Sequence, residues 1–317
     1  MEKLVSKPIF LQWYVQLVVL GITLAVYLGT NSPLIAMLLA VEIFGMVVLE
    51  VKYGAKEHGW KNEIKDTVIA LAIAIIIWYG ASFVLNTVSP ASAVVSCSML
   101  PNLQRGDFVL VQGAPATSNE MYMTDANVAS LSEDATIQYA AKNYTVKGSI
   151  FSYCQFIKDD LCTAFFKEPE KFTEQKGPLT FTYSQCQLKT KEGTTPLPCV
   201  TSVEDSKKKY VVTNGGDTIV YSPSPNELYA LFGDIVHRAF FTIKTPTGKQ
   251  YYLTKGDNNP ILDIQAYDFR YMRGNKPVTP QEFKGKVITR IPYLGYFKLV
   301  ISGFWTEPEQ CRTQLIY

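Results

Sequence analysis

Two kinds of side chain in the polar part of the chain could together support nucleophilic catalysis: serine hydroxyls and one imidazole. The chain has two histidines. His58 lies in a lysine-rich stretch between apolar segments, whereas His237 lies in the apolar run 235–239, where a buried titratable ring needs a hydrogen-bonding partner. Ser98 lies about ten residues beyond the third apolar segment. Because a serine hydroxyl is a weak nucleophile unless a base accepts its proton, Ser98 would require His237.

Carboxylates that could orient this imidazole follow a predicted strand at 249–254. Asp257 and Asp263 both lie in the turn after it, and either could complete a Ser-His-Asp arrangement. Lys255 is most simply a solvated charge at the strand end, and it would act as a rival base only if burial lowered its pKa. This chemistry requires no metal and no cofactor.

Long apolar stretches in the first third predict the element that must position these groups. They run over 9–30, 33–51 and 67–88, each close to the length that spans a bilayer. Between the second and third lie four lysines: Lys52, Lys56, Lys61 and Lys65. The positive-inside rule therefore predicts a cytoplasmic N-terminus, and three crossings place everything after residue 90 outside. We expect residues 1–90 to be a retained three-helix anchor in the lipid bilayer of the plasma membrane.

The remainder, residues 91–317, predicts an all-β domain. Short β-rich runs punctuated by Gly, Pro and Asn cover 107–112, 217–222, 234–243, 249–254 and 286–300. A polar stretch at 114–212 interrupts them and predicts an inserted subdomain. It contains Cys154, Cys162, Cys186 and Cys199, without a C-x-x-C pair or a histidine, which favours disulfides over zinc. The pairing stays open.

The charge of the chain argues against nucleic acid as a partner. The formal net charge is +2, and the 30 Lys and Arg residues form no basic run that could follow a phosphate backbone.

Five blocks in this order resemble the conserved boxes of type I signal peptidases. They are Ser98-Met99-Leu100-Pro101 with Arg105-Gly106-Asp107, Gly216-Asp217-Thr218-Ile219-Val220-Tyr221, Ile235-Val236-His237-Arg238, Lys255-Gly256-Asp257-Asn258-Asn259 with Asp263, and Gly285-Lys286-Val287 running into Ile291-Pro292-Tyr293-Leu294-Gly295-Tyr296. Bacterial members have a lysine base where this chain has His237, so the sequence resembles the archaeal and endoplasmic-reticulum branch.

The resemblance implies a signal-peptidase-like β fold and a serine endopeptidase that removes signal peptides from exported preproteins. Ser98 would be the nucleophile, His237 the general base, and Asp257 or Asp263 the supporting carboxylate. The Ser98 N–H, assisted by the Ser96 hydroxyl, would stabilise the oxyanion.

Three features depart from the family pattern: the insert, the two additional spans, and Cys97, which we expect to be a packed thiol. The insert opens the alternative of a specialised peptidase for one surface protein, and the added spans leave a need for partner membrane proteins undecided. A catalytically inactive, membrane-tethered binding module is the third interpretation.

Overall fold

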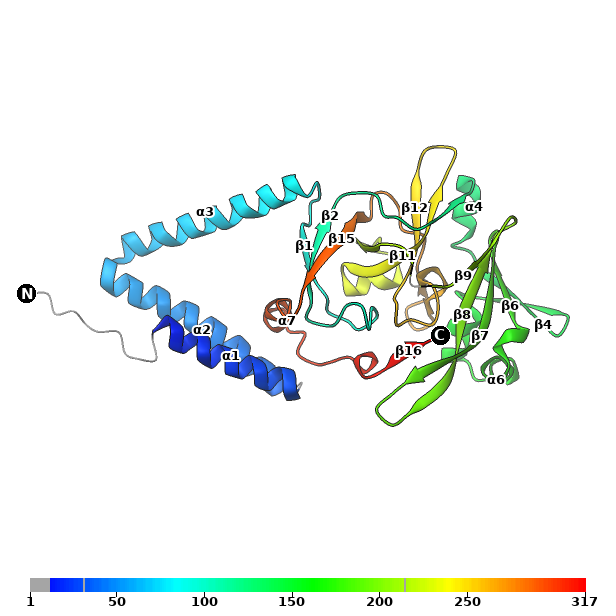
Figure 1. Cartoon of the computed structure of the whole chain (residues 1–317), viewed down its shortest axis with the longest axis horizontal. Helices are drawn as coiled ribbons and strands as arrows, with labels where there is room; N and C mark the ends of the chain where they lie inside the picture. Colours follow the sequence, from blue (N-terminus) through cyan, green and yellow to red (C-terminus); the bar gives the residue numbers. More distant parts are fainter. Residues whose placement is uncertain (1–11, 31, 214) are drawn as a thin grey trace, which may run out of the picture.

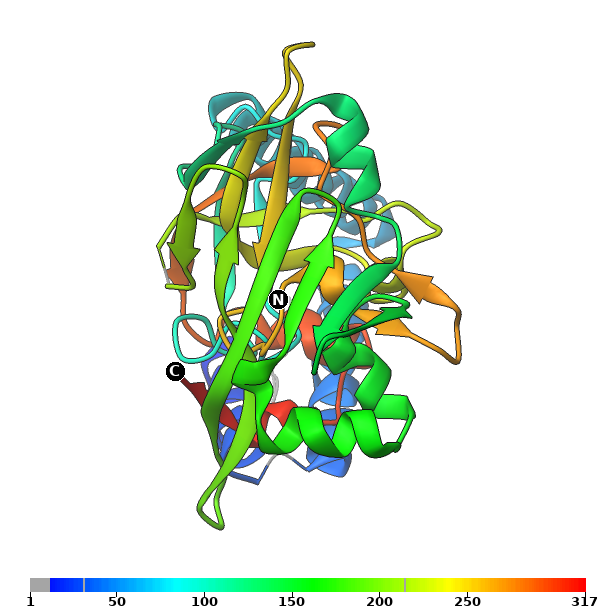
Figure 2. The ribbon, with the colours of Figure 1, turned by 90° about the vertical axis from the view of Figure 1, so that its right-hand side faces the viewer.

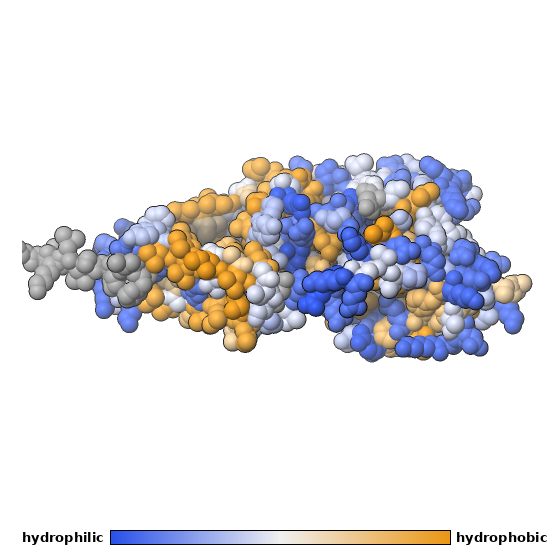
Figure 3. All heavy atoms as spheres, turned by 60° about the horizontal axis from the view of Figure 1, so that its bottom comes forward, coloured by the Kyte–Doolittle hydropathy of each residue, from blue (hydrophilic) through white to orange (hydrophobic). Residues whose placement is uncertain are grey.

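Three long apolar helices precede a mostly β region in the computed structural model, which describes residues 12–30, 32–213 and 215–317. The helices are α1 (Trp13–Thr30), α2 (Pro33–His58) and α3 (Trp60–Val84). All three are long and apolar enough to cross a membrane, and their apolar side chains cover the outer surface of this part of the molecule (Figure 3). The three predicted spans are thus largely confirmed as helices, although residues 9–11 of the first lie outside the described residues and the third ends at Val84 instead of residue 88.

The lysine-rich stretch is helical rather than a loop. Lysine and glutamate are good helix formers, so α2 continues to His58 and α3 begins at Trp60. Only Gly59 separates them, with a φ of 80° that favours glycine. The two helices consequently meet at a sharp turn, at the end of the molecule opposite the β region, and diverge from it like the arms of a V (Figure 1).

The first two helices contact the β region through an apolar cluster that includes Tyr27 of α1 and Ala36 of α2. Tyr27 of α1 is fully buried. Its hydroxyl donates to the Trp305 carbonyl at 3.3 Å and accepts from Arg105 Nη1 at 3.2 Å, and its ring meets that of Tyr296 edge-to-face. These contacts fix the anchor to the chain that flanks Ser98.

Seven strands form the first sheet, in the order β1-β2-β15-β10-β11-β12, with β3 pairing in parallel with β11. Their bounds are β1 (Ala91–Ala93), β2 (Phe108–Gln112), β3 (Asn119–Tyr122), β10 (Thr218–Tyr221), β11 (Ile235–Lys244), β12 (Gln250–Lys255) and β15 (Phe283–Ile291). The strand β1 lies at one edge.

A second seven-stranded sheet lies farthest from the helices and faces the first (Figures 1 and 2). Its order is β5-β4-β6-β7-β8-β9, and β16 pairs with β7. Its members are β4 (Ala135–Tyr139), β5 (Lys142–Val146), β6 (Thr173–Lys176), β7 (Leu179–Lys189), β8 (Thr194–Glu204), β9 (Lys209–Val211) and β16 (Gln314–Ile316). Most strands come from the predicted insert, but β16 comes from the end of the sequence.

Short elements complete the β region. They are α4 (Asp125–Ser130), α5 (Ile150–Phe156), α6 (Asp160–Lys167), α7 (Tyr296–Ile301), the 3-10 turns η2 (Pro169–Lys171), η3 (Leu228–Phe232), η4 (Asp263–Gln265) and η5 (Glu309–Arg312), and the paired strands β13 (Tyr267–Asp268) and β14 (Arg273–Gly274).

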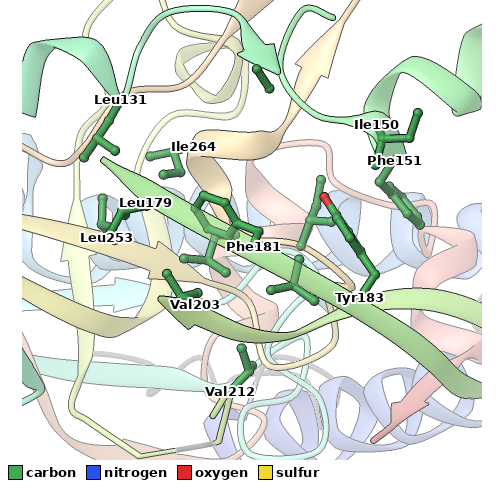
Figure 4. Packing of buried hydrophobic residues seen from close by; sticks show 14 of the residues in the cluster. Leu131, Ile150, Phe151, Leu179, Phe181, Tyr183, Val203, Val212, Leu253 and Ile264 are labelled. Carbon is green, nitrogen blue, oxygen red and sulfur yellow. The ribbon is translucent and has the colours of Figure 1, made fainter. Parts of the chain in front are cut away.

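The two sheets share one apolar core. Phe181 and Val203 from the second sheet pack in the same cluster as Leu253 from the first (Figure 4). Phe241 of the first sheet is also a member of this cluster. Ile264 of η4 belongs to it as well. Because burial of each such side chain contributes about 2 kcal/mol, the insert stabilises the sheet that carries His237.

Two sequence expectations are wrong. The predicted strand at 286–300 ends at Ile291, and residues 296–301 form helix α7, because Tyr293 turns the chain with a φ of 65°. Cys97 is not a free packed thiol, since it forms a disulfide with Cys311.

The four cysteines of the insert form the expected disulfides. They pair as Cys154 with Cys162 and Cys186 with Cys199. The first disulfide connects α5 to α6, and the second connects neighbouring strands β7 and β8.

Candidate active site

A chain of hydrogen bonds connects three of the singled-out side chains. His237 Nε2 lies 2.9 Å from Ser98 Oγ, and His237 Nδ1 lies 2.6 Å from Asp263 Oδ2. All three residues are buried. When Nδ1 carries the proton that Asp263 accepts, Nε2 presents a lone pair to the Ser98 hydroxyl. This geometry allows the imidazole to accept the hydroxyl proton.

The Asp263 carboxylate is held by two further hydroxyl groups. Thr254 Oγ1 donates to Oδ2 at 2.6 Å, and the Tyr221 hydroxyl donates to the same atom at 3.1 Å. Burial, reinforced by the Asp263 charge, raises the pKa of Tyr221 well above its usual value. Tyr221 therefore remains protonated and continues to donate its hydrogen bond to Asp263.

Strand register explains why these groups meet. Ile219 of β10 pairs with His237, and Ala239 of β11 pairs with Thr254. Since side chains two residues apart lie on the same face of a strand, Tyr221 and Thr254 share the His237 face.

The turn after β12 holds the segment that contains Ser98. The Asn258 N–H donates to the Ser98 carbonyl at 2.7 Å, and Asn258 Nδ2 donates to the Cys97 carbonyl at 3.1 Å. A β-carbon at Gly256 would lie 2.7 Å from the Ser98 carbonyl oxygen, so this close approach requires glycine. On its other side the segment is fixed by the disulfide from Cys97 to Cys311.

A cleft of about 370 Å³ opens beside Ser98 and His237. One wall is the edge segment 93–96, and another is the start of β11 with the residue before it, at 234–237. Phe304, Pro308 and Gln310 also line it. An extended peptide could therefore lie between the β1 edge and β11, with its carbonyl carbon near Ser98 Oγ.

Comparison with curated proteins identifies relatives of part of the chain. The signal peptidase complex catalytic subunit SEC11 of Eremothecium gossypii is 35% identical over 89 residues, which is 27% of this chain and 47% of that protein. The subunit of the same name from Saccharomyces cerevisiae (strain YJM789) is 36% identical over 87 residues, again 27% of this chain and 47% of the relative. The chain thus spans about half the length of the curated relatives it matches. These matches support the endoplasmic-reticulum-type signal peptidase family.

No family model matches the chain. The relatives support the family resemblance of the sequence blocks, whereas the roles of single residues in this chain stay predictions.

The other candidate carboxylate of the signal peptidase resemblance lies elsewhere. Asp257 accepts from Arg238 Nε and Nη2, each at 2.7 Å, and from Asn102 Nδ2 at 2.7 Å. Arg238 follows His237 in β11 and so projects from the opposite face of the strand. The structure thus brings Asp263, and not Asp257, to the imidazole.

Lys255 is buried, so the expectation that it is a solvated charge is wrong, and its side chain projects away from His237. It pairs in register with Arg238, and its Nζ donates to the Gly256 carbonyl at 3.0 Å. Burial lowers its pKa to about 8, against the opposing charges of Asp257 and Asp263. Nζ also lies 4.9 Å from the centre of the Tyr317 ring.

The Ser96 hydroxyl lies 3.1 Å from Ser98 Oγ, on the side of the cleft formed by the edge segment. The position is compatible with the oxyanion role that the resemblance implies. Among the described residues, no group of three or more His, Cys, Asp or Glu side chains could hold a metal ion.

Sequence reasoning quoted Tyr221 and Asn258 within the family blocks but gave them no role, and it missed Thr254 and Cys311. The alternation of residues in the strands could have identified Tyr221 and Thr254, given a correct pairing of β10, β11 and β12. Nothing in the sequence links Cys311 to Cys97, since 214 residues separate them.

Proposed function

We propose that this protein is a membrane-bound serine endopeptidase that removes signal peptides from exported preproteins. The observation that carries the proposal is the hydrogen-bonded series from Ser98 through His237 to Asp263, which lies beside an open cleft. The partial similarity to SEC11 proteins, which their name describes as signal peptidase catalytic subunits, supports it.

In the proposed reaction, Ser98 Oγ attacks the scissile carbonyl while His237 Nε2 takes the hydroxyl proton. The imidazolium that forms is stabilised by the Asp263 carboxylate, and it then gives the proton to the leaving amine. Water hydrolyses the acyl-enzyme with the same base. The carboxylate of Asp257 neutralises Arg238 and takes no part.

The oxyanion would be stabilised by the Ser98 N–H and the Ser96 hydroxyl. Within the described part of the chain, no group accepts a hydrogen bond from that N–H, so it is free to donate. Removal of one such donor typically costs several kcal/mol of transition-state stabilisation.

The edge strand β1 offers a binding mode for the substrate. Val94 uses its N–H and carbonyl to bond Asp107 and Gly106, so the backbone groups of Ala93 and Val95 point the other way, toward the cleft. A cleavage segment could add as a further strand there. The resemblance to signal peptidases implies small side chains just before the cut, as signal peptides have.

The proposed arrangement in the membrane follows the lysine-rich stretch. With residues 1–90 as the anchor and the N-terminus cytoplasmic, residues 91–317 lie outside the plasma membrane as a signal-peptidase-like β domain interrupted by 114–212. Ser98 then lies close to the membrane surface, because α3 ends at Val84.

The test is cleavage of a model preprotein by purified protein in detergent. Wild type should release the signal peptide, and Ser98→Ala and His237→Ala should each lower kcat by at least about a thousandfold. Lys255→Ala is the control, because Lys255 is the alternative candidate for the general base, and this variant should retain cleavage. Retained cleavage in His237→Ala together with loss in Lys255→Ala would overturn the proposed base, and an intact preprotein with wild type would favour an inactive binding module.

A further inference from the structure

A second cavity, of about 360 Å³, adjoins the cleft beside Ser98. The two hollows share four lining residues: Tyr229, Phe232, Asn259 and Gln310. They are therefore neighbouring parts of one surface depression, and an extended peptide that leaves the first would enter the second.

Helix α5 of the insert supplies the far wall of the second cavity. Phe151, Gln155 and Phe156 line it, and Tyr267 and Ile261 face them from the η4 region. Nine of its fifteen lining residues are apolar or aromatic and six are polar or charged, and the cavity is large enough to receive one substrate side chain.

This wall is rigidly placed relative to the catalytic residues. Ser149 caps α5 by accepting from the Ser152 N–H at 3.0 Å, and Ser152 Oγ donates to the Gln265 carbonyl at 2.9 Å. Gln265 ends the turn that begins with Asp263. The disulfide from Cys154 to Cys162 fixes the same helix to α6, so the wall is preorganised for binding.

The cavity carries no net charge from its described lining. Its charged side chains are Asp268 and Arg270, and they neutralise each other through a contact of 2.7 Å. The Arg270 guanidinium also lies over the Phe156 ring, 5.5 Å from its centre. Because both charges are already paired, an uncharged side chain is the better ligand.

The position of the cavity indicates which part of a substrate enters it. Helix α5 belongs to the insert, whose sheet lies at the end of the molecule away from the membrane helices (Figures 1 and 2). In a preprotein the signal peptide's apolar region remains in the bilayer. The residues that extend away from the bilayer are those after the cut, at the start of the mature protein.

We propose that the second cavity is a subsite for an uncharged aromatic or large apolar side chain among the first few residues of the mature protein. The insert then determines substrate preference by contacting the product that leaves, on the other side of the cut from the signal peptide. This inference rests on the proposed peptidase activity and adds a specificity site to it.

The experiment compares preproteins that differ at one mature position. A single phenylalanine is moved through the first few mature positions of a segment otherwise built of alanine and serine, with an aspartate series in parallel. Wild type should cleave the phenylalanine substrate at one position with a kcat/KM roughly tenfold above that of the alanine parent, mainly through KM, since an apolar pocket typically discriminates on this scale. Aspartate there should give no gain.

Three variants locate the effect in the cavity. Phe156→Ala should bring the ratio of phenylalanine to alanine substrate close to one, and Phe156→Leu should restore part of it. Ile157→Ala is the matched control, because this exposed neighbour lies outside the cavity lining, and it should retain the full ratio.

Equal cleavage of all substrates by wild type would overturn the subsite while leaving the peptidase activity intact. Cleavage of none of them would overturn the proposed function and the subsite with it. A preference that survives in Phe156→Ala but is lost in Ile157→Ala would place the specificity elsewhere in the insert.

Discussion

Replacement of Asp263 by asparagine removes a negative charge and little else. Thr254 and Tyr221 both donate to the carboxylate oxygen that faces His237, so they should hold the amide with its oxygen in that place. The tautomer of the imidazole is then preserved, and what is lost is the attraction between the carboxylate and the imidazolium that forms during attack.

The magnitude follows from the separation and burial of this pair. Nδ1 and Oδ2 are 2.6 Å apart, and the side chains are 6% and 2% exposed. With charge centres about 4 Å apart and an effective dielectric constant of about 20, the interaction is worth about 4 kcal/mol. Because each 1.4 kcal/mol or so is a factor of ten, kcat should fall about a thousandfold.

The assay is kcat with saturating preprotein in detergent, and Asp257→Asn is the matched control. That change weakens the ion pair with Arg238, so the free energy of unfolding should fall by about 3 kcal/mol, but kcat of the folded fraction should stay close to wild type. Wild-type kcat in Asp263→Asn, or an equal fall in Asp257→Asn, would refute the assignment of the carboxylate.

Three further predictions concern stability. Burial lowers the pKa of Lys255 to about 8 from 10.5, so between those pH values the unfolded chain binds more protons than the folded protein. The free energy of unfolding should therefore rise with pH across this range by up to about 3 kcal/mol. Thermal unfolding should show this rise in wild type and not in Lys255→Met. The double change of Cys97 and Cys311 to alanine removes a crosslink between residues 214 positions apart. The free energy of unfolding should fall by about 5 kcal/mol from the gain in chain entropy of the unfolded state, and kcat should fall because the Ser98 segment is held less firmly. An unchanged free energy of unfolding and an unchanged kcat would contradict the role of the disulfide. In Gln265→Ala the buried Glu174 carboxylate loses the amide donor that lies 2.6 Å from it. Calorimetry should therefore report a free energy of unfolding about 2 kcal/mol lower, and a preserved unfolding temperature would contradict the role of this hydrogen bond.

The membrane helices could be predicted from the sequence because each is a long, almost uninterrupted run of apolar residues. About 20 apolar residues in succession allow few alternatives. The boundary at the lysine-rich stretch was less accurate, since lysine and glutamate at 52–58 are compatible both with a loop and with a continuing helix. Likewise the apolar run 296–301 fits a strand or a helix, and the turn at Tyr293 decided for the helix.

The site was predictable where one residue type was scarce and not where several were equivalent. His237 was the single exported histidine under the expected topology, which left one candidate base. Asp257 and Asp263 follow the same strand, and their sequence spacing does not reveal which side of the sheet each carboxylate reaches. Only the structure shows that Asp257 contacts Arg238, on the face of strand β11 opposite to His237.

The disulfide beside Ser98 ties the order of synthesis to the ability to cut. In the proposed topology, residue 97 is made and exported long before its partner, 214 positions later. During synthesis, Ser98 therefore lies on a segment that no disulfide yet holds. The disulfide can form only after residue 311 has reached an oxidising compartment. We expect a newborn molecule to remain a poor hydrolase until translocation has brought both thiols together.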